Sequence, residues 1–465
     1  MPSLIWLTDR SRYETGTGRC ARRRYLQYHA GPTGYGLARK GESVPLATGI
    51  YYARGVEQLM LFMKQSDQLP DVDVVRAAVK YAREAYERKL TLKGFHGALS
   101  SDITNETIKE QSVLIGGLIW AFALRFLPWL HESFRILEVE QERLHFLDCT
   151  CGAGTGIFEQ RIHDERECAG TALMIRTDIL AQHRRAQHLA YFECKTTGWE
   201  SDAWAEQWET KPQLGLGTLD LEKRYGNEVT EIYIVGAGKG ARKKDQYHPE
   251  DPMKRQQSPL CYGYCRPGSP PHAKDEWLPA REWKNEANET KRISKAHRRR
   301  GIWELEKSDW PIWQAYQTSD PELQYDEFWF RQLPPSVLDR ASFVLGPLNR
   351  QDAQLLSIRR SMLSDEIRWR ETLWALYQEQ QQGHTWASPE FQAKLDELVP
   401  CSWNCRPFGK EHQCEMTYLC FREAGWEDPI GSGKFQPRLP HHAPETEQAV
   451  ARGLLPEDAE DLDEE

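Results

Sequence analysis

The spacing of apolar residues predicts an α/β core in the first half of the chain. Residues 104–130 carry an apolar face at helical spacing, and residues 134–146 alternate apolar and charged positions, as a half-buried strand does. The core continues with two strands, a helix and a strand, predicted over 172–180, 189–194, 202–225 and 231–235. The order helix, three strands, helix, strand predicts an α/β fold around a central sheet.

A second long helix is predicted over residues 352–382, where apolar side chains recur at helical spacing. The longest apolar run, Val113–Leu124, ends at Arg125. It is shorter than the roughly 18–20 residues needed to cross a bilayer, so we expect a buried helix there. The N-terminal residues lack the basic and apolar regions of a secretory signal. These features predict an intracellular, cytoplasmic protein without a membrane-spanning segment.

Composition adds the class of protein and the distribution of its charge. With 28% charged and 40% hydrophobic residues, the 465-residue chain is neither a membrane protein, a collagen-like fibre nor a wholly disordered chain. Residues 444–465 hold nine acids and one base, which gives −8 of the total −9 and leaves −1 for the rest. This tail lacks aromatic residues, and we expect it to be disordered.

Basic residues are concentrated in three segments, at 19–24, 239–244 and 281–300. The acidic total therefore does not exclude a DNA partner, because phosphate binding depends on local charge. Seven residues of the second and third segments are the predicted DNA-binding residues: Lys239, Arg242, Lys243, Lys244, Arg298, Arg299 and Arg300.

Two carboxylates and a lysine form the strongest catalytic pattern. Asp178 lies on one predicted strand, and Glu193 and Lys195 lie on the next, separated by Cys194. Side chains alternate along a strand, so Glu193 and Lys195 share one face. If Asp178 is adjacent, the two carboxylates and the backbone carbonyl of Cys194 can hold one Mg²⁺, which prefers oxygen ligands. A surface ion-pair pattern on a hairpin is the alternative interpretation.

Four cysteines within twenty residues indicate a soft metal centre in a reducing compartment. They follow the predicted 352–382 helix, and they are Cys401, Cys405, Cys414 and Cys420. A structural zinc could take all four in a tetrahedral site. A 4Fe-4S cluster also takes four thiolates, which need not be close in sequence. The residues alone leave both centres open.

The Asp178…Glu193-x-Lys195 pattern, followed by a helical glutamine, resembles the PD-(D/E)xK nuclease core in its RecB-like branch. Ser258–Tyr264 and Glu110–Glu140 add to the likeness, which is to the iron–sulfur exonucleases of phages and CRISPR adaptation. The resemblance implies a restriction-endonuclease-like core, αβββαβ, with a mixed sheet flanked by helices. It also implies a metal-dependent DNA nuclease that acts as an exonuclease on single strands or DNA ends.

The resemblance assigns roles to individual residues. Asp178 and Glu193 become ligands of Mg²⁺ or Mn²⁺, Lys195 the catalytic lysine, and Gln213 the helical glutamine, with Gln207 as the alternative. Glu140 becomes a further metal or water ligand. The family commonly has a metal-binding histidine in an early helix, where this chain has Ala53, so Glu57 one turn later is the candidate substitute. Two-metal chemistry and a weakly active or inactive DNA-binding protein both stay open as a result.

For the cysteines, the resemblance favours a structural 4Fe-4S cluster that joins the two ends of the chain. One ligand of such clusters comes from near the N-terminus and three from the C-terminus. Cys20, Cys405, Cys414 and Cys420 match these positions, and Cys401 is left over. The resemblance further implies partners in a recombination, repair or defence complex.

The patterns divide the chain into five regions. They are an N-terminal helical region with the first cluster cysteine (1–100), the nuclease core (101–265), a basic Trp-rich insertion (266–345), a long helix with the C-terminal iron–sulfur region (346–430) and an acidic disordered tail (431–465).

Overall fold

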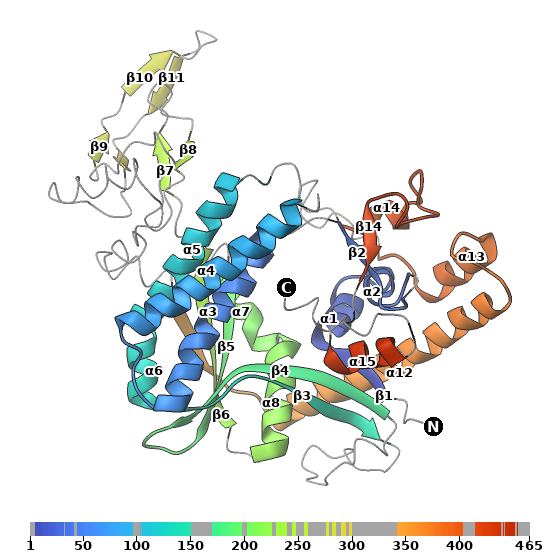
Figure 1. Ribbon diagram of the computed structural model, residues 1–465, viewed down its shortest axis with the longest axis horizontal. Helices are drawn as coiled ribbons and strands as arrows, with labels where there is room; N and C mark the ends of the chain where they lie inside the picture. Colours follow the sequence, from blue (N-terminus) through green and yellow to red (C-terminus); the bar gives the residue numbers. More distant parts are fainter. Residues whose placement is uncertain are drawn as a thin grey trace.

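The computed structural model describes residues 5–95, 105–149, 170–197, 202–225, 229–239, 342–402 and 414–451, apart from a few single positions and 41–43, together with short strands between 244 and 299. Its centre is a six-stranded mixed sheet with helices on both faces (Figure 1). The strands of this sheet are β1 (Ile5–Asp9), β3 (Phe134–Cys149), β4 (Gly170–His183), β5 (Leu189–Thr197), β6 (Val229–Gly238) and β13 (Ser342–Leu348).

The predicted order of elements is found in the structure, with two helices each broken in two. The helix expected over 104–130 is α5 (Asn105–Arg125) and α6 (Leu127–Ser133), and α6 has a proline at its first positions. The helix expected over 202–225 is α7 (Asp202–Thr210) and α8 (Pro212–Tyr225). Proline has no N–H to continue the preceding helix, and it is well tolerated in a first turn.

Strand β4 is the branching point of the sheet. One edge of β4 pairs with β3 along almost its whole length. On its other edge, Gly170–Met174 pair with β1 in parallel and Ile179–Gln182 pair with β5 in antiparallel orientation. Residues 175–178 lie between these two pairings, so β1 and β5 diverge at this point. Beyond it, β5 continues in parallel with β6.

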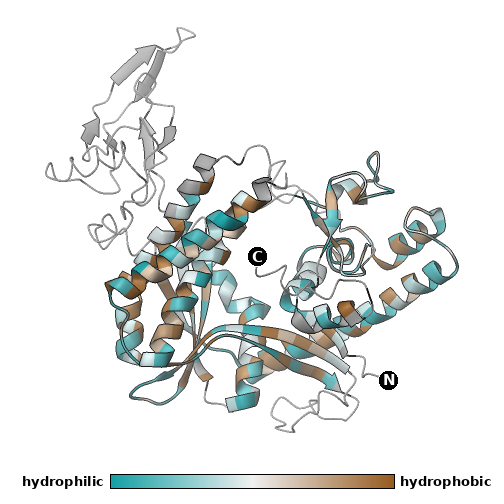
Figure 2. Cartoon of the chain, in the orientation of Figure 1, coloured by the Kyte–Doolittle hydropathy of each residue, from teal (hydrophilic) through white to brown (hydrophobic). Residues whose placement is uncertain are grey.

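Helices cover both faces of the sheet because its strands carry apolar side chains on both faces. Figure 2 shows hydrophobic residues along these strands. On one face, Phe192 and Ile179 belong to a core shared with α3 (Val44–Ser66), α4 (Val72–Phe95) and α5. On the other face, Tyr191 and Leu180 pack with residues of α7 and α8. Helix α12 (Asp352–Gln381) packs against α8. At the sheet edge, the ring of Phe343 occupies the place that a Cβ at Gly236 would need.

The two ends of the chain form one body beside α12. This part contains α1 (Arg10–Gly18), α2 (Ala21–Tyr28), α13 (Pro389–Leu398), α14 (Thr417–Cys420), α15 (Ala443–Ala451) and the paired strands β2 (Leu37–Arg39) and β14 (Phe435–Pro437) (Figure 1). Its apolar core joins Leu26 and Leu37 to Trp369, Phe391 and Leu419. Helix α2 and strand β2 are therefore held by residues more than three hundred positions away.

A buried ion-pair network reinforces this body. The Arg24 guanidinium is fully buried and donates to Asp365 at 3.0 Å and to both carboxylate oxygens of Glu366 at 2.7 and 2.8 Å. It also lies 4.6 Å from the centre of the Trp369 ring. Arg22 donates to the Val399 carbonyl at 2.7 Å.

These contacts show how the bases of the segment at 19–24 are used. Arg22 and Arg24 are buried, and Arg23 pairs with Glu415 at 2.9 Å. Their charges are used inside the protein, because a buried guanidinium needs carboxylate or carbonyl partners to offset its lost hydration.

The expectation that residues 431–465 are a disordered tail is wrong for the part that the structure describes. β14 pairs with β2, and α15 follows from Ala443. The Glu445 side chain is buried and accepts from Arg12 at 2.6 and 2.7 Å. Glu445, which the sequence places in the acidic tail, is therefore an ion-pair partner of Arg12 on α1.

Just before the basic segment at 239–244, β6 runs to Gly238 and pairs with both β5 and β13. Farther along, the structure describes six short strands in three antiparallel pairs. They are β7 (Lys244–Tyr247), β8 (Arg255–Ser258), β9 (Glu276–Leu278), β10 (Arg281–Lys284), β11 (Thr290–Ile293) and β12 (His297–Arg299).

One helical stretch among the described residues, Leu114–Ser133, is long and apolar enough to cross a membrane by length and composition. About 72% of it is buried inside the protein. Leu114, Leu118 and Phe122 belong to the core between α5 and the sheet, which confirms the predicted buried helix.

Candidate active site and cysteine cluster

The divergence of β1 and β5 at the edge of β4 creates a cavity of about 270 Å³. Asp178 lies at the end of the stretch of β4 that neither strand pairs with, and its Oδ2 accepts a hydrogen bond from the Cys194 backbone N–H at 2.7 Å. Glu193 follows the last β5 residue paired with β4, Phe192. Asp178, Glu193, Lys195 and Gln213 all line the cavity. The topology thus brings together the four predicted catalytic residues.

Glu193 is the centre of the contacts in this cavity. Its carboxylate is 1% exposed and is ion-paired with Lys195. Gln213, at the start of α8, and Tyr191 each donate a hydrogen bond to it. Gln207, the alternative glutamine, instead donates to the Trp204 carbonyl within α7 at 2.9 Å. The side chain of Cys194 points away and packs against the core on the opposite face of the sheet.

The carboxylates of the cavity repel one another, and this repulsion contributes to the raised pKa values of Asp178 and Glu140. Burial and the charge of Glu193 raise the pKa of Asp178 to about 6, despite the nearby Lys195. Burial opposes the charged form of Lys195, but Glu193 and Asp178 outweigh it and raise the pKa of the ammonium. At neutral pH the lysine is therefore positively charged, and two carboxylates compete for it.

Glu140 and Glu57, the two further candidate ligands, also lie near this group. Glu140 sits on β3 with a left-handed backbone (φ 47°), between residues that pair with the β4 positions on either side of Asp178, and it contacts Arg176 at 2.8 Å. Burial and the charge of Asp178 raise the pKa of Glu140 to about 8, and Glu57 on α3 adds to this shift. A left-handed backbone is costly for a glutamate, and such residues often mark functional sites.

Sequence reasoning missed several residues that line the cavity. Asp9 and Arg10 come from the junction of β1 and α1, and Arg176 and Glu142 from β4 and β3. No local pattern identifies them, because β1 reaches the cavity only by pairing with β4. The positive charge of Arg10 disfavours protonation of Lys195, so it lies within electrostatic range of the lysine.

His442 reaches the cavity from the C-terminal segment. Its Nδ1 donates to Glu142 at 2.6 Å and its Nε2 to Asp9 at 3.3 Å. Burial opposes the charged imidazolium, but the hydrogen bonds to Asp9 and Glu142 raise the pKa of His442 to about 9. The residue adds a positive charge to a cavity wall, although the sequence places it beside an acidic tail.

Two thiols, those of Cys401 and Cys420, are in contact at the junction of the chain ends. A hydrogen bond from Cys420 lowers the pKa of Cys401 to about 6, and the same contact raises the pKa of Cys420. Cys414 interacts electrostatically with both Cys420 and Cys20. Cys20, Cys414 and Cys420 of the predicted set thus lie within electrostatic range of a neighbouring thiol, and Cys401, which the sequence interpretation left over, contacts Cys420. Cys405 lies outside the described residues.

The predicted DNA-binding residues are largely beyond what the structure describes. Lys239 follows β6, whereas Arg242, Lys243 and Arg300 lie outside the described residues. The backbones of Lys244, Arg298 and Arg299 belong to β7 and β12.

Comparison of the sequence with models of known protein families and with curated proteins found no match. Across the described ranges, no three His, Cys, Asp or Glu side chains are arranged closely enough to enclose a metal ion. In the candidate active site, the Glu193 carboxylate instead contacts Lys195 and Gln213.

Proposed function

We propose that this protein is a metal-dependent DNA nuclease of the PD-(D/E)xK type. The observation that carries the proposal is the group formed by Asp178, Glu193 and Lys195 in a cavity at the sheet's branching point. Carboxylates are costly to bury without compensating charge, and here one lysine faces two of them. Such an arrangement is typical of sites where a cation completes the charge balance.

The residues fit a hard divalent cation. Oxygen ligands from Asp178 and Glu193, with the Cys194 carbonyl and Glu140 or Glu57 as further ligands, match the preference of Mg²⁺ or Mn²⁺. Burial and neighbouring carboxylates raise the pKa values of Asp178 and Glu140, and a shared cation would offset this repulsion. When bound, the cation would neutralise charge on a scissile phosphate and activate a water molecule.

The protein's own groups supply the rest of the chemistry. Lys195 keeps its proton at neutral pH and can donate hydrogen bonds to the phosphate oxygens as negative charge develops there. Gln213 and Tyr191 fix the orientation of the Glu193 carboxylate. Burial and Glu193 raise the pKa of Tyr191, so its hydroxyl remains a donor. Arg10 and the exposed Arg176 add positive charge for the entering strand.

The cysteine cluster fits a 4Fe-4S centre that joins the chain ends. Cys20, Cys414 and Cys420 would be ligands, with Cys405 as the fourth by the resemblance and Cys401 as the candidate favoured by its contact with Cys420. Such a centre would supply a structural link, in which cluster binding contributes to folding. The apolar core around Leu26 and Leu419 already joins the same segments, so the centre would reinforce an existing interface.

Degradation of end-labelled single- and double-stranded DNA with Mg²⁺ or Mn²⁺ tests the nuclease proposal. The wild type should degrade DNA only with the metal, and Glu193→Gln and Lys195→Met should lose at least 100-fold of the rate, the usual scale for removing one group that stabilises transition-state charge. Asp67→Asn, an exposed carboxylate paired with Arg184, is the matched control and should keep full activity. Equal rates for wild type and both variants would contradict the assignment.

The same protein tests the iron–sulfur proposal. Anaerobically purified protein should be brown and contain iron and sulfide in equal amounts. Colourless protein that contains one zinc would contradict the cluster and support a structural zinc site. A wild-type protein that carries the cluster and binds DNA but never degrades it would favour the inactive DNA-binding alternative.

A further inference from the structure

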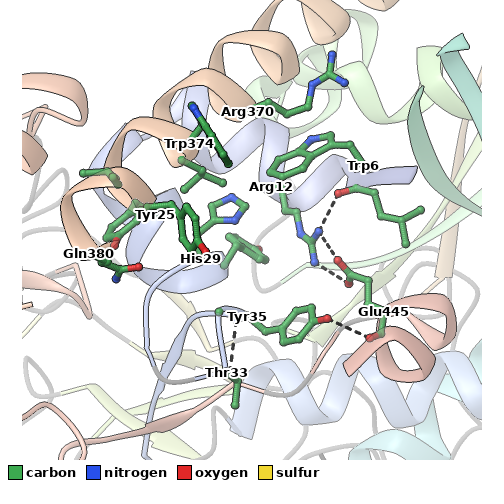
Figure 3. Close-up of a pocket in the computed structure, with 16 residues that line it drawn as sticks. Trp6, Arg12, Tyr25, His29, Thr33, Tyr35, Arg370, Trp374, Gln380 and Glu445 are labelled. Atoms are coloured by element: carbon green, nitrogen blue, oxygen red, sulfur yellow. Dashed lines mark hydrogen bonds and ion pairs between the residues drawn. The ribbon is translucent and has the colours of Figure 1, made fainter. Parts of the chain in front are cut away.

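A second and larger cavity, of about 670 Å³, lies on the other side of the β1–α1 junction from the candidate active site. Leu7 and Arg12 line this cavity, whereas Asp9 and Arg10 between them line the candidate active site. The same division recurs in the C-terminal segment, where His442 lines the active site and Glu445 the larger cavity. The β1–α1 junction and the C-terminal segment therefore contribute residues to both cavities, and Figure 3 shows the larger one.

Seven of the sixteen residues that line the larger cavity carry aromatic rings. The His29 ring is stacked between Trp6 and Trp369, with ring centres 6.0 and 5.6 Å apart and interplanar angles of 17° and 26°. On α12, Trp374 and Tyr377 line the opening and lie against each other at 5.7 Å and 31°. Trp374 is 61% exposed and Tyr377 47% exposed, which is unusual for such large apolar rings.

The polar groups that line this cavity differ in charge. The Arg12 guanidinium is neutralised by Glu445, so this pair forms a wall and is not a free cation. The buried Nε2 of His29 has no hydrogen-bond partner among the described residues. Burial and the charges of Arg24 and Arg12 keep the pKa of His29 well below its usual value, so the ring is neutral.

Arg370 adds a cation at the opening, one helical turn before Trp374. Its guanidinium lies 3.9 Å from the Asp148 carboxylate, a distance beyond that of a good hydrogen bond. A flat apolar wall, a neutral hydrogen-bonding edge and a cation at the rim are the three contacts that a nucleotide makes with a protein. The volume suits one or two nucleotides.

We propose that this cavity binds an unpaired nucleobase of the DNA strand whose adjoining nucleotides lie in the candidate active site. The base stacks on Trp374 and Tyr377, its polar edge meets His29 Nε2, and Arg370 contacts the neighbouring phosphate. This inference rests on the proposed function for the identity of the strand. A base inside the cavity cannot be paired, so the site selects single strands or frayed ends.

Binding of a fluorescein-labelled ten-residue dT strand to the full-length protein, measured by anisotropy in metal-free buffer, tests the inference without cleavage. Trp374→Ala and Tyr377→Ala should each weaken binding by about 5- to 150-fold, the range for loss of one stacked base. Trp374→Phe should restore most of the affinity. Tyr81→Ala is the matched control, because Tyr81 is equally exposed, at 47%, on α4, and it should bind as the wild type does.

A strand with one abasic position connects the loss to a base. If the nucleotide that matters most is made abasic, the wild type should bind the strand more weakly. Trp374→Ala should bind the abasic strand and the intact strand with equal affinity, because its stacking contact is already lost. Unchanged binding by Trp374→Ala and Tyr377→Ala, or losses that add fully, would overturn the inference.

The two proposals fail separately. If the protein binds single strands through Trp374 but does not degrade them, the nuclease proposal is contradicted and the nucleobase site is supported. If the protein degrades DNA and Trp374→Ala binds single strands as the wild type does, only the nucleobase site is contradicted.

Discussion

Asp178→Asn should have two effects of opposite sign, which makes it a sharp test of the carboxylate cluster. The substitution removes a charge that the metal-free protein disfavours and that the metal-bound protein requires. Asparagine keeps an oxygen that can accept the 2.7 Å hydrogen bond from the Cys194 N–H, so the local backbone is preserved. Without metal the variant should therefore be more stable than the wild type, and metal should stabilise it less.

The magnitude follows from the raised pKa of Asp178. A shift from 3.8 to about 6 corresponds to about 3 kcal/mol, at roughly 1.4 kcal/mol per unit, and this net shift already includes the attraction to Lys195. An increase of about 1–3 kcal/mol in the free energy of unfolding is expected at pH 8. Between pH 4 and 6 the folded wild type binds more protons than the unfolded chain, so its stability falls as the pH rises. The difference between variant and wild type should accordingly vanish near pH 4.

The metal effect is measured in the same experiment. With 10 mM Mg²⁺ and a dissociation constant on the order of 1 mM, binding should stabilise the wild type by about 1.4 kcal/mol and the variant hardly at all. Urea unfolding at pH 8, with EDTA or with Mg²⁺, provides all four values. Asp67→Asn is the control, because a hydrogen bond from Arg184 lowers the pKa of Asp67, and this exposed substitution should slightly destabilise the protein with or without metal. A less stable Asp178→Asn in EDTA, or an unchanged response to Mg²⁺, would refute the cluster.

Three further predictions concern the junction of the chain ends. Arg24→Met should lower the free energy of unfolding by about 3–5 kcal/mol, since it leaves two carboxylates of α12 buried without their partner, and urea unfolding measures this. His442 should stabilise the fold by up to about 3 kcal/mol below pH 6.5, and this contribution should disappear as the pH rises through 9, because its pKa is raised in the folded state; His442→Gln should remove that pH dependence from unfolding curves at pH 6 and 9.5. Cys401→Ser should reduce the iron content more than Cys405→Ser if contact with Cys420 defines the fourth ligand, whereas the reverse order would support the sequence-based assignment.

The local sequence pattern was sufficient for the elements of the core. Alternation along 134–146 predicted β3, because a strand with one face buried and one face polar has an apolar period of two. The strand predicted over 189–194 is β5. The same alternation predicted the shared face of Glu193 and Lys195, which are in contact. Proline positions inside two predicted helices coincide with the breaks before α6 and α8.

Only the tertiary structure decided what surrounds these residues. Asp9 and His442 are 433 positions apart, and Arg12 meets Glu445 across the same separation. A local pattern records which side of an element is apolar, but it does not record which distant element will cover that side. The burial of Arg22 and Arg24, the structured part of the acidic segment and the aromatic cavity all depend on that long-range packing. The sequence by itself therefore determined the strands and the Asp178, Glu193 and Lys195 pattern, and the fold determined the cavity in which these residues meet.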